Sequence, residues 1–306
     1  MPERVAAIDV GTNTVLLLVA ERAGDSLVPV VERAEITRLG RGVDASRRLD
    51  PAAIRETVGV LAAFAGEARA LGASRVSCVA TSAARDAANG AEFFEAARRA
   101  AGVVPEVISG DEEARLVFAS AWRDFGGEGR GALAVLDVGG GSTELTFGDG
   151  PHPAGRTSLQ IGAVRLTERH VRRDPPPAEE IAAVRAAARD ALRPAAAAIP
   201  RGARLVAVAG TVTTLSAVQQ VLPAYDAARV HGATLSRAEL EALLARLAAL
   251  PLRERAAVPG MEPKRADVIV AGCAIVLEAM AAGGFDRLTV SDRGVRWGLV
   301  YDRLDR

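Results

Sequence analysis

The 306-residue sequence predicts an α/β protein of two related lobes, each built on a mixed sheet flanked by helices. Three observations lead to this prediction. Strand-like apolar runs alternate with helix-like segments along both halves of the chain. A glycine-containing turn between two apolar runs occurs twice. Its two copies lie about half a chain apart, which indicates two lobes rather than a solenoid with its much shorter repeats.

The first copy of this turn follows the N-terminal strand 5–10. The strand ends at Asp9 and Val10, and the turn leads into a second strand from residue 14 onward. The second copy lies within residues 133–147, where an apolar run, Asp137, three glycines, two hydroxyl residues, Glu144 and another apolar run are typical of strand, tight turn and strand. Asp9 recurs as Asp137 and Gly11 as Gly139, both 128 positions later.

Each of these turns has the composition of a phosphate-binding loop. Glycine adopts φ > 0 and leaves no side chain over the backbone, so successive amides can point into one concavity that holds phosphate oxygens. One copy alone would favour a plain glycine-rich hairpin. Two copies, facing each other across a cleft between the lobes, would hold a chain of phosphates. The predicted phosphate-binding residues are Gly11, Thr12, Asn13, Thr14, Gly139, Gly140, Gly141, Ser142 and Thr143.

Two helix starts in the N-terminal half carry clear signals. Asp50-Pro51 places an N-cap acid before a proline at the first helical position. Ser109 and Glu112 fit a capping box, which accounts for Glu112 as a structural residue. Glu113 is not needed by the cap. It is either a surface acid favoured by the helix dipole or a carboxylate turned toward the cleft.

Composition limits the possible partners. The net charge is zero and the pI is about 6.9, so no overall field attracts nucleic acid, and any basic surface must be local. One local candidate is a loop whose arginines are mostly solvated, although one or two could line an anion path. These arginines are Arg33, Arg38, Arg41, Arg47 and Arg48.

Cellular location is predicted from cysteine use and from apolar runs. Cys78 and Cys273 each lie in an apolar run, which favours buried thiols in a reducing compartment. No signal peptide opens the sequence, and the longest apolar run, 268–277, is too short to span a bilayer. We therefore expect a cytoplasmic protein without a membrane partner.

The glycine-rich segment 126–131 is the expected hinge. This segment divides the chain into an N-terminal lobe, 1–125, and a C-terminal lobe, 126–306. The first lobe would carry the first turn and Glu113, and the second lobe would carry the second turn.

With these motifs placed, the chain resembles the Ppx/GppA phosphatases, which comprise exopolyphosphatases and guanosine pentaphosphate phosphohydrolases. The resemblance spans essentially the whole chain. It rests on residues 9–14, on Thr81-Ser82-Ala83, on Ser109 through Ala114, and on Asp137 through Leu145. It implies the two-lobed actin-like ATPase fold, which is ribonuclease H-like, and it implies a homodimer.

The resemblance also assigns roles to single residues. Glu113 matches the catalytic glutamate, and Arg85 matches a phosphate-binding arginine. Asp137 and Glu144 match carboxylates associated with a divalent ion, which we expect to be Mg²⁺, with Mn²⁺ as the alternative. One departure is Val295-Arg296-Trp297-Gly298, where the family commonly has Leu-Arg-Glu-Gly. The missing acid puts any charge pair there in doubt.

These residues predict Mg²⁺-dependent removal of the terminal phosphate from inorganic polyphosphate, with Glu113 as general base. Removal of the 5′ γ-phosphate of guanosine pentaphosphate is the alternative with the same chemistry. A kinase or ATPase of the same fold is a second class, against which the paired acids after Ser109 argue. A third class is a non-catalytic sensor that binds guanosine tetraphosphate or polyphosphate.

Overall fold

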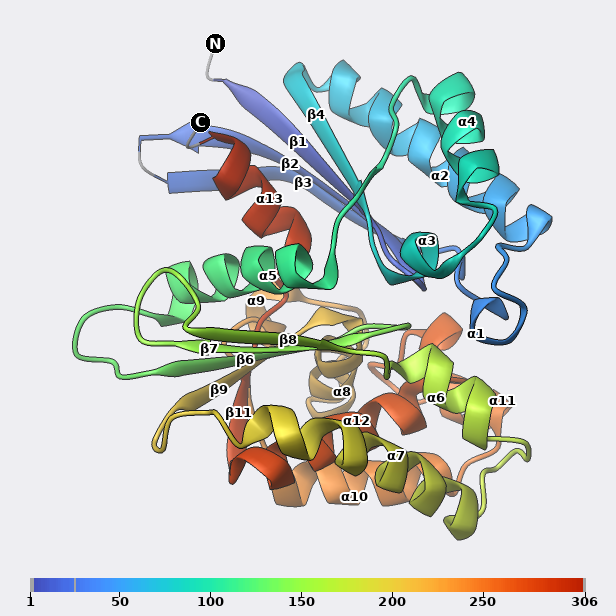
Figure 1. Cartoon of the computed structure of the whole chain (residues 1–306), viewed down its shortest axis with the longest axis vertical. Coiled ribbons are helices and arrows are strands. Elements are labelled where there is room, and N and C mark those ends of the chain that lie inside the picture. Colours follow the sequence, from blue (N-terminus) through green and yellow to red (C-terminus); the bar gives the residue numbers. More distant parts are fainter. Residues whose placement is uncertain (1–2, 25, 305–306) are drawn as a thin grey trace. The chain divides into compact units, whose positions relative to one another are not determined.

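The structure, a computed structural model, describes residues 3–24 and 26–304. These residues form two compact units (Figure 1). The first unit holds the described residues up to Leu116 together with those from Val295 onward, and the second holds Val117–Gly294. The sequence-based division at residues 125 and 126 differs from this grouping in two places, the second half of one helix and the final helix.

The first unit contains a five-stranded sheet in the order β3-β2-β1-β4-β5. Strands β1, β4 and β5 run parallel, and β1, β2 and β3 form an antiparallel meander. The elements are β1 (Arg4–Val10), β2 (Thr14–Ala23), β3 (Ser26–Ile36), α1 (Val43–Ser46), α2 (Pro51–Ala70), β4 (Ala73–Ala80), α3 (Ser82–Asp86), α4 (Gly90–Ala101), β5 (Glu106–Val107), the first part of α5 (Gly110–Phe125) and α13 (Val295–Leu304).

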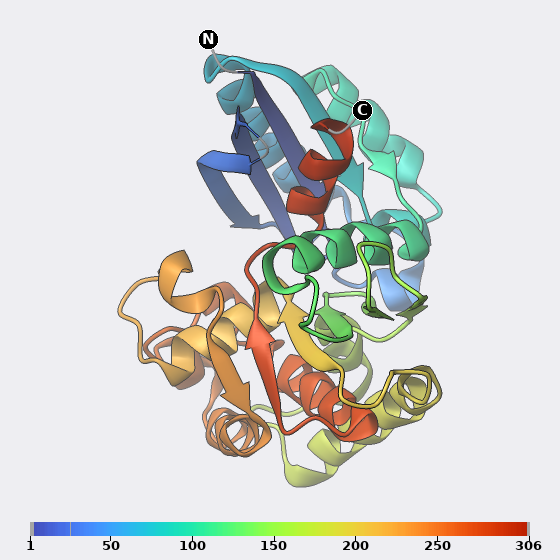
Figure 2. The ribbon, with the colours of Figure 1, turned by 90° about the vertical axis from the view of Figure 1, so that its left-hand side faces the viewer.

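Helices cover both faces of this sheet (Figures 1 and 2). α2 and α4 pack on one face, and α13 packs against β1 and β2 on the other. β1 is therefore buried along almost its whole length, as an apolar run in a central strand requires. The final helix belongs to the first unit, where it packs against β1 and β2 and its Trp297 is fully buried.

The second unit contains a six-stranded sheet in the order β10-β11-β9-β6-β7-β8. Strands β6, β9 and β11 run parallel, and Figure 2 shows β9 and β11 side by side. Besides the second half of α5, the elements are β6 (Leu133–Val138), β7 (Thr143–Gly148), β8 (Gly155–Leu159), α6 (Ala163–His170), α7 (Ala178–Ala196), β9 (Arg204–Val208), α8 (Ala209–Gln219), α9 (Ala227–Val230), β10 (Thr234–Ser236), α10 (Arg237–Ala248), α11 (Leu252–Ala256), a 3₁₀ turn (Pro263–Arg265), α12 (Ile269–Gly283) and β11 (Arg287–Val290). The core lies between the sheet and helices α6, α7, α8, α10 and α12, with α12 buried along most of its length.

The repeat predicted from sequence is present in both sheets. The order β3-β2-β1-β4 in the first sheet matches β8-β7-β6-β9 in the second, with the same parallel and antiparallel pairings. The registers match as well, since Asp9 pairs with Leu16 and Asp137 pairs with Glu144. The two lobe-like units are therefore copies of one strand arrangement.

The two helix starts give different outcomes. The carboxylate of Asp50 accepts hydrogen bonds from the amides of Ala52 and Ala53, so that cap is confirmed. The capping box at Ser109 is only half correct. The amide of Glu112 donates to Ser109 Oγ at 3.1 Å, but the Glu112 carboxylate binds Arg115, which lies one turn further along the helix, at 2.7 and 2.8 Å.

Two glycine substitutions in the first unit should change stability in opposite directions. A Cβ at Gly298 would lie 2.1 Å from the carbonyl oxygen of Leu116, whereas a Cβ at Gly59 on α2 meets nothing within 4 Å. We expect Gly298→Ala to lower the free energy of unfolding by about 1–3 kcal/mol through overpacking. Gly59→Ala should raise it by about 0.5–1 kcal/mol through helix propensity. Urea unfolding of both variants checks this, and equal effects would contradict the packing of α13 on α5.

Candidate active site

The first glycine turn lies at the carboxyl end of β1 and is closed by its own backbone. The Gly11 amide donates to the Thr14 carbonyl at 2.9 Å. A Cβ at Gly11 would lie 3.1 Å from that same carbonyl oxygen, so a side chain there would crowd the turn. The second turn is closed in the same way. The Gly139 amide donates to the Ser142 carbonyl at 3.1 Å, and a Cβ at Gly139 would lie 3.0 Å from that oxygen.

The carbonyls of the first turn are bound on one side. The Gly40 amide donates to Thr12 O at 2.8 Å, and the amides of Thr37 and Arg38 both donate to Asn13 O at 3.1 Å. A trans peptide plane directs a carbonyl and the amide that follows it to opposite sides. The amides of Asn13 and Thr14 are therefore directed away from the 37–40 loop.

In the second unit, α6 binds the carbonyls of the second turn. The Ala163 amide donates to Gly139 O and the Val164 amide to Gly140 O, both at 2.9 Å. The buried Arg165 side chain adds a bond from Nε to Gly141 O at 2.7 Å. By the same peptide geometry, the amides of Gly140, Gly141 and Ser142 are directed away from α6. Each unit thus presents a row of oriented backbone amides, the arrangement that binds phosphate oxygens.

The structure brings two of the predicted residues, Glu113 and Arg85, into direct contact. Arg85 Nη1 donates to Glu113 Oε2 at 2.8 Å and to the carbonyl of Ile108 at 2.9 Å. The side chains of Arg85 and Glu113 are only 17 % and 10 % exposed. Burial raises the pKa of the Glu113 carboxyl above its ordinary value, and the charge of Arg85 opposes that rise.

The Arg85–Glu113 pair and the first turn lie at the same edge of the first sheet. β1, β4 and β5 are parallel, so their carboxyl ends meet there. The Thr81 amide donates to Val10 O and the Ile108 amide to Ala80 O, both at 3.1 Å. These two bonds join the three strand ends.

Several buried polar atoms at this edge have no hydrogen-bond partner among the described residues. They are Asp9 Oδ1, Asn13 Nδ2, Ser82 Oγ and Arg85 Nη2. Buried polar atoms are normally satisfied in folded proteins. A group of such atoms at one sheet edge therefore indicates a place where a polar ligand or water binds.

Asp9 is the most strongly perturbed carboxyl at this edge. Burial raises its pKa to about 7, the negative charge of Glu113 adds to the rise, and Arg296 opposes it. Asp9 and Glu113 are thus two neighbouring carboxyls that compete for ionisation.

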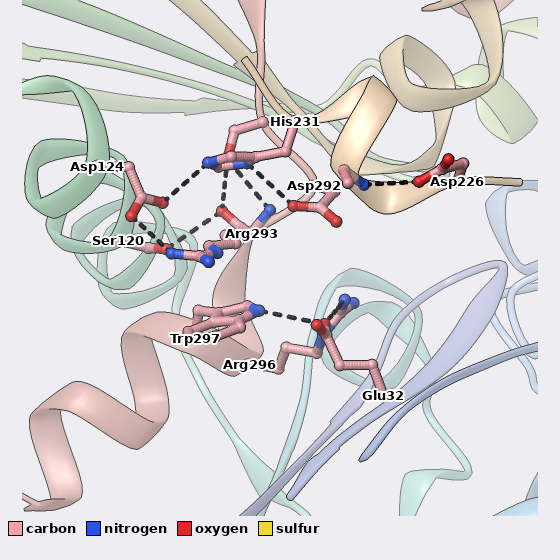
Figure 3. Close-up of polar contacts among 11 residues, drawn as sticks. Glu32, Ser120, Asp124, Asp226, His231, Asp292, Arg293, Arg296 and Trp297 are labelled. Carbon is pink, nitrogen blue, oxygen red and sulfur yellow. Dashed lines mark hydrogen bonds and ion pairs between the residues drawn. The ribbon is translucent and has the colours of Figure 1, made fainter. Parts of the chain in front are cut away.

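The region where the sequence departs from the family pattern also lies in the first unit (Figure 3). The Arg296 side chain forms an ion pair with Glu32 of β3, and Trp297 Nε1 donates to the same Glu32 oxygen at 3.2 Å. The doubt about a charge pair here is therefore resolved. The partner acid comes from β3 and not from the position next to Arg296.

Asp137 and Glu144 lie directly opposite each other on β6 and β7. Opposite residues of an antiparallel pair project from the same face, so these two buried side chains are neighbours. Ser158 of β8 donates to Glu144 Oε1 at 2.7 Å and holds that carboxylate in place. At the matching position of the first unit, Asp9 has Leu16 opposite it and no second carboxylate.

A further polar cluster in the second unit was not foreseen from the sequence (Figure 3). His231 lies between two carboxylates, with Nδ1 3.0 Å from Asp292 and Nε2 3.6 Å from Asp124. Arg293 binds Asp124 at 2.7 Å, and Ser120 Oγ donates to the Arg293 carbonyl at 3.2 Å. The cluster joins the second half of α5 to the segment that follows β11.

Comparisons with known proteins identify the family. A model of the Ppx/GppA phosphatase family matches residues 18–306. The chain belongs to the Ppx/GppA phosphatase family. Exopolyphosphatase 2 of Mycobacterium tuberculosis is 41 % identical to it, with 97 % of both chains covered.

Solved structures of family members agree with the fold. The Ppx/GppA family member of Aquifex aeolicus is 34 % identical and has a TM-score of 0.83, with 99 % of this chain and 98 % of that chain covered. An exopolyphosphatase of Cytophaga hutchinsonii is 27 % identical with a TM-score of 0.91 and the same coverage. The predicted family, the α/β actin-like ATPase fold and the phosphatase class of enzyme are thus confirmed.

Two features are absent from residues 3–24 and 26–304. No group of three or more His, Cys, Asp or Glu side chains there could hold a metal ion. No helix in that part of the chain combines the length and the apolar character needed to cross a bilayer.

The functional contacts that sequence reasoning missed join residues far apart in the chain. Ser158 binding Glu144, Arg165 binding the second turn, and Glu32 binding Arg296 are examples. One signal was available in the sequence. Aligning the two repeats matches Leu16 to Glu144, which shows that the second turn has an additional carboxylate.

The raised pKa of Asp9 predicts a stability effect of pH. The group binds a proton more tightly in the folded state, so the stability it contributes is present below pH 4 and is lost as pH rises to about 7. The loss is at most roughly 4 kcal/mol. Asp9→Asn removes this titration. The free energy of unfolding of the variant, measured relative to wild type, should therefore increase between pH 4 and pH 7 and keep that increase at pH 8. Urea unfolding across this pH range measures the difference, and a constant difference would contradict it.

Proposed function

We propose that this protein hydrolyses the terminal phosphate of inorganic polyphosphate, with Glu113 as general base. The observation that carries the proposal is the buried Glu113–Arg85 pair beside the first glycine turn. Arg85 holds Glu113 through Nη1 and has a buried Nη2 for which the described residues offer no partner. The similarity to a relative named exopolyphosphatase supports the choice of substrate.

Hydrolysis of a phosphoanhydride requires mainly positioning and charge neutralisation, because the transition state is loose and leaves little covalent chemistry for the protein to perform. In the proposal, the outward-directed amides of each turn bind phosphate oxygens, and Arg85 Nη2 donates to one such oxygen. These amides are those of Asn13, Thr14, Gly140, Gly141 and Ser142, because the Gly11 and Gly139 amides close the turns. Glu113 orients the attacking water and accepts its proton. The bond to Arg85 fixes the direction of the Glu113 carboxylate.

A divalent ion fits the pair Asp137 and Glu144. Mg²⁺ prefers oxygen ligands and is commonly held by one or two carboxylates with water and substrate phosphates completing its shell. Two neighbouring carboxylates, one of them fixed by Ser158, suit such a site. We propose Mg²⁺ there, with Mn²⁺ as the alternative. The bound ion would offset negative charge on the phosphate oxygens.

Guanosine pentaphosphate would undergo the same chemistry, because it also ends in a phosphoanhydride. Phosphate release from each substrate, with and without Mg²⁺, separates the two activities. Tight binding without any release would instead favour the non-catalytic sensor. Light scattering in solution tests the homodimer.

The general base predicts a sharp contrast between two neighbouring acids. Glu113→Gln keeps the shape and a hydrogen-bonding oxygen for Arg85 but cannot accept the proton. We expect phosphate release to fall by about 10²–10⁴-fold while polyphosphate binding remains. Glu112→Gln is the matched control, because the Glu112 carboxylate pairs with Arg115 on the same helix. Equal turnover in the two variants would exclude Glu113 as the base.

The Arg85–Glu113 bond predicts a shift in the pH profile. Arg85 lowers the pKa of Glu113, so Arg85→Gln should raise that pKa further. Because the base acts in its ionised form, the acidic limb of the profile of kcat/KM should move to higher pH. A steady-state pH profile of both proteins measures the shift. A limb at the same pH in both would mean that another group controls it.

A further inference from the structure

An arginine-rich loop lies directly beside the first glycine turn. We call residues 37–48 the arginine loop; it carries Arg38, Arg41, Arg47 and Arg48 against a single acid, Asp44. Its first part is bound to the turn by the amides of Thr37, Arg38 and Gly40, as described above.

Packing brings the arginine loop close to the Arg85 helix as well. A Cβ at Gly40 would lie 2.3 Å from Thr12 Cγ2 and 3.0 Å from Ala83 Cβ. Glycine at position 40 therefore lets the loop meet both the turn and α3. Ala83 is two residues before Arg85.

The far end of the arginine loop is fixed too. The Ala88 amide donates to Arg47 O at 2.8 Å. The buried Asn89 side chain binds both backbone groups of Leu49, accepting from the amide at 2.7 Å and donating to the carbonyl at 3.1 Å. The loop is thus held at both ends against the segments that carry the first turn and Arg85.

Two of the arginines have a backbone conformation that disfavours any residue with a side chain. Arg38 has φ 53° and Arg47 has φ 56°, both in the left-handed region. Glycine is the least costly residue there, and the same loop uses Gly42 at φ 75°. If only the shape of the loop mattered, glycine would suit Arg47 as well. The shape of the loop therefore does not by itself explain an arginine at position 47.

Arg41 and Arg47 form no ion pair within the described part of the chain. Backbone hydrogen bonds lower the pKa of the nearby Asp50, and the charge of Arg41 adds to that effect. Arg48 pairs with Glu92 at 3.3 Å, whereas Arg41 and Arg47 are exposed and form no ion pair with a described carboxylate. In a protein of zero net charge, Arg41 next to the first turn and Arg47 next to the Arg85 segment give this surface a local positive charge.

We propose that the arginine loop binds the internal phosphates of a polyphosphate chain whose terminal phosphate lies at the first turn. Arg41 and Arg47 are its principal contacts. This inference rests on the proposed function and extends it. The loop would favour a long inorganic chain over a substrate with few phosphates, because only the long chain places further charges along it.

The test compares two variants with a control. Arg41→Gln combined with Arg47→Gln removes both charges. Arg47→Gly removes one charge and relieves the left-handed backbone. Arg75→Gln is the control, because Arg75 lies near the start of β4, at the opposite edge of the sheet from the turn. Each protein is assayed for phosphate release from tripolyphosphate and from a chain of several tens of phosphates, and for direct binding of the long chain.

We expect the double variant to raise KM for the long chain by about five- to tenfold at low salt, since each exposed charge contact contributes modestly. The change for tripolyphosphate should be much smaller, and the effect should shrink as salt rises. Arg47→Gly should raise the same KM by a smaller factor while Tm stays equal or increases. Arg75→Gln should behave as wild type.

The outcomes separate the inference from the function on which it rests. If wild type releases phosphate from neither substrate and does not bind the long chain, the proposed function fails. If wild type is active but the double variant keeps its KM for the long chain, the arginine loop is not the subsite. The same conclusion follows if both substrates are affected equally.

Discussion

The planarity of the peptide group determines what the two glycine turns can do. In each turn one amide closes the loop on a carbonyl three residues ahead, Gly11 on Thr14 and Gly139 on Ser142. Neighbouring segments then bind the remaining carbonyls, so the following amides have only one direction left. The 37–40 loop does this in the first unit, and α6 with Arg165 does it in the second. The amide rows are thus oriented before any ligand arrives, which is the condition for strong electrostatic binding.

The two copies of the turn have diverged at one position that matters chemically. The strand position opposite the turn aspartate holds Leu16 in the first unit and Glu144 in the second. The second unit therefore has a pair of carboxylates suited to a cation. The first has a single buried carboxyl, Asp9, near Glu113 and Arg296. A duplicated framework thus carries two different charge environments, one with two adjacent carboxylates and one with a single buried carboxyl close to Glu113.

Local sequence signals identified most of the framework. The turns, the Asp50 cap and the strand repeat depend on neighbouring residues or on a fixed spacing, which sequence displays directly. Glu113 stood out because the cap did not need it, yet its bond to Arg85 joins residues 28 positions apart. The capping box failed in part because Arg115 competes for the Glu112 carboxylate. The Glu32–Arg296 pair spans 264 positions, so only tertiary structure could reveal it.

The position of α13 has a consequence for synthesis on the ribosome. The second unit is a continuous stretch of chain, but the first unit is complete only after α13 has left the ribosome and packed against β1 and β2. One apolar face of the N-terminal sheet therefore stays uncovered while residues 117–294 are translated. In this protein the part made first is the part completed last.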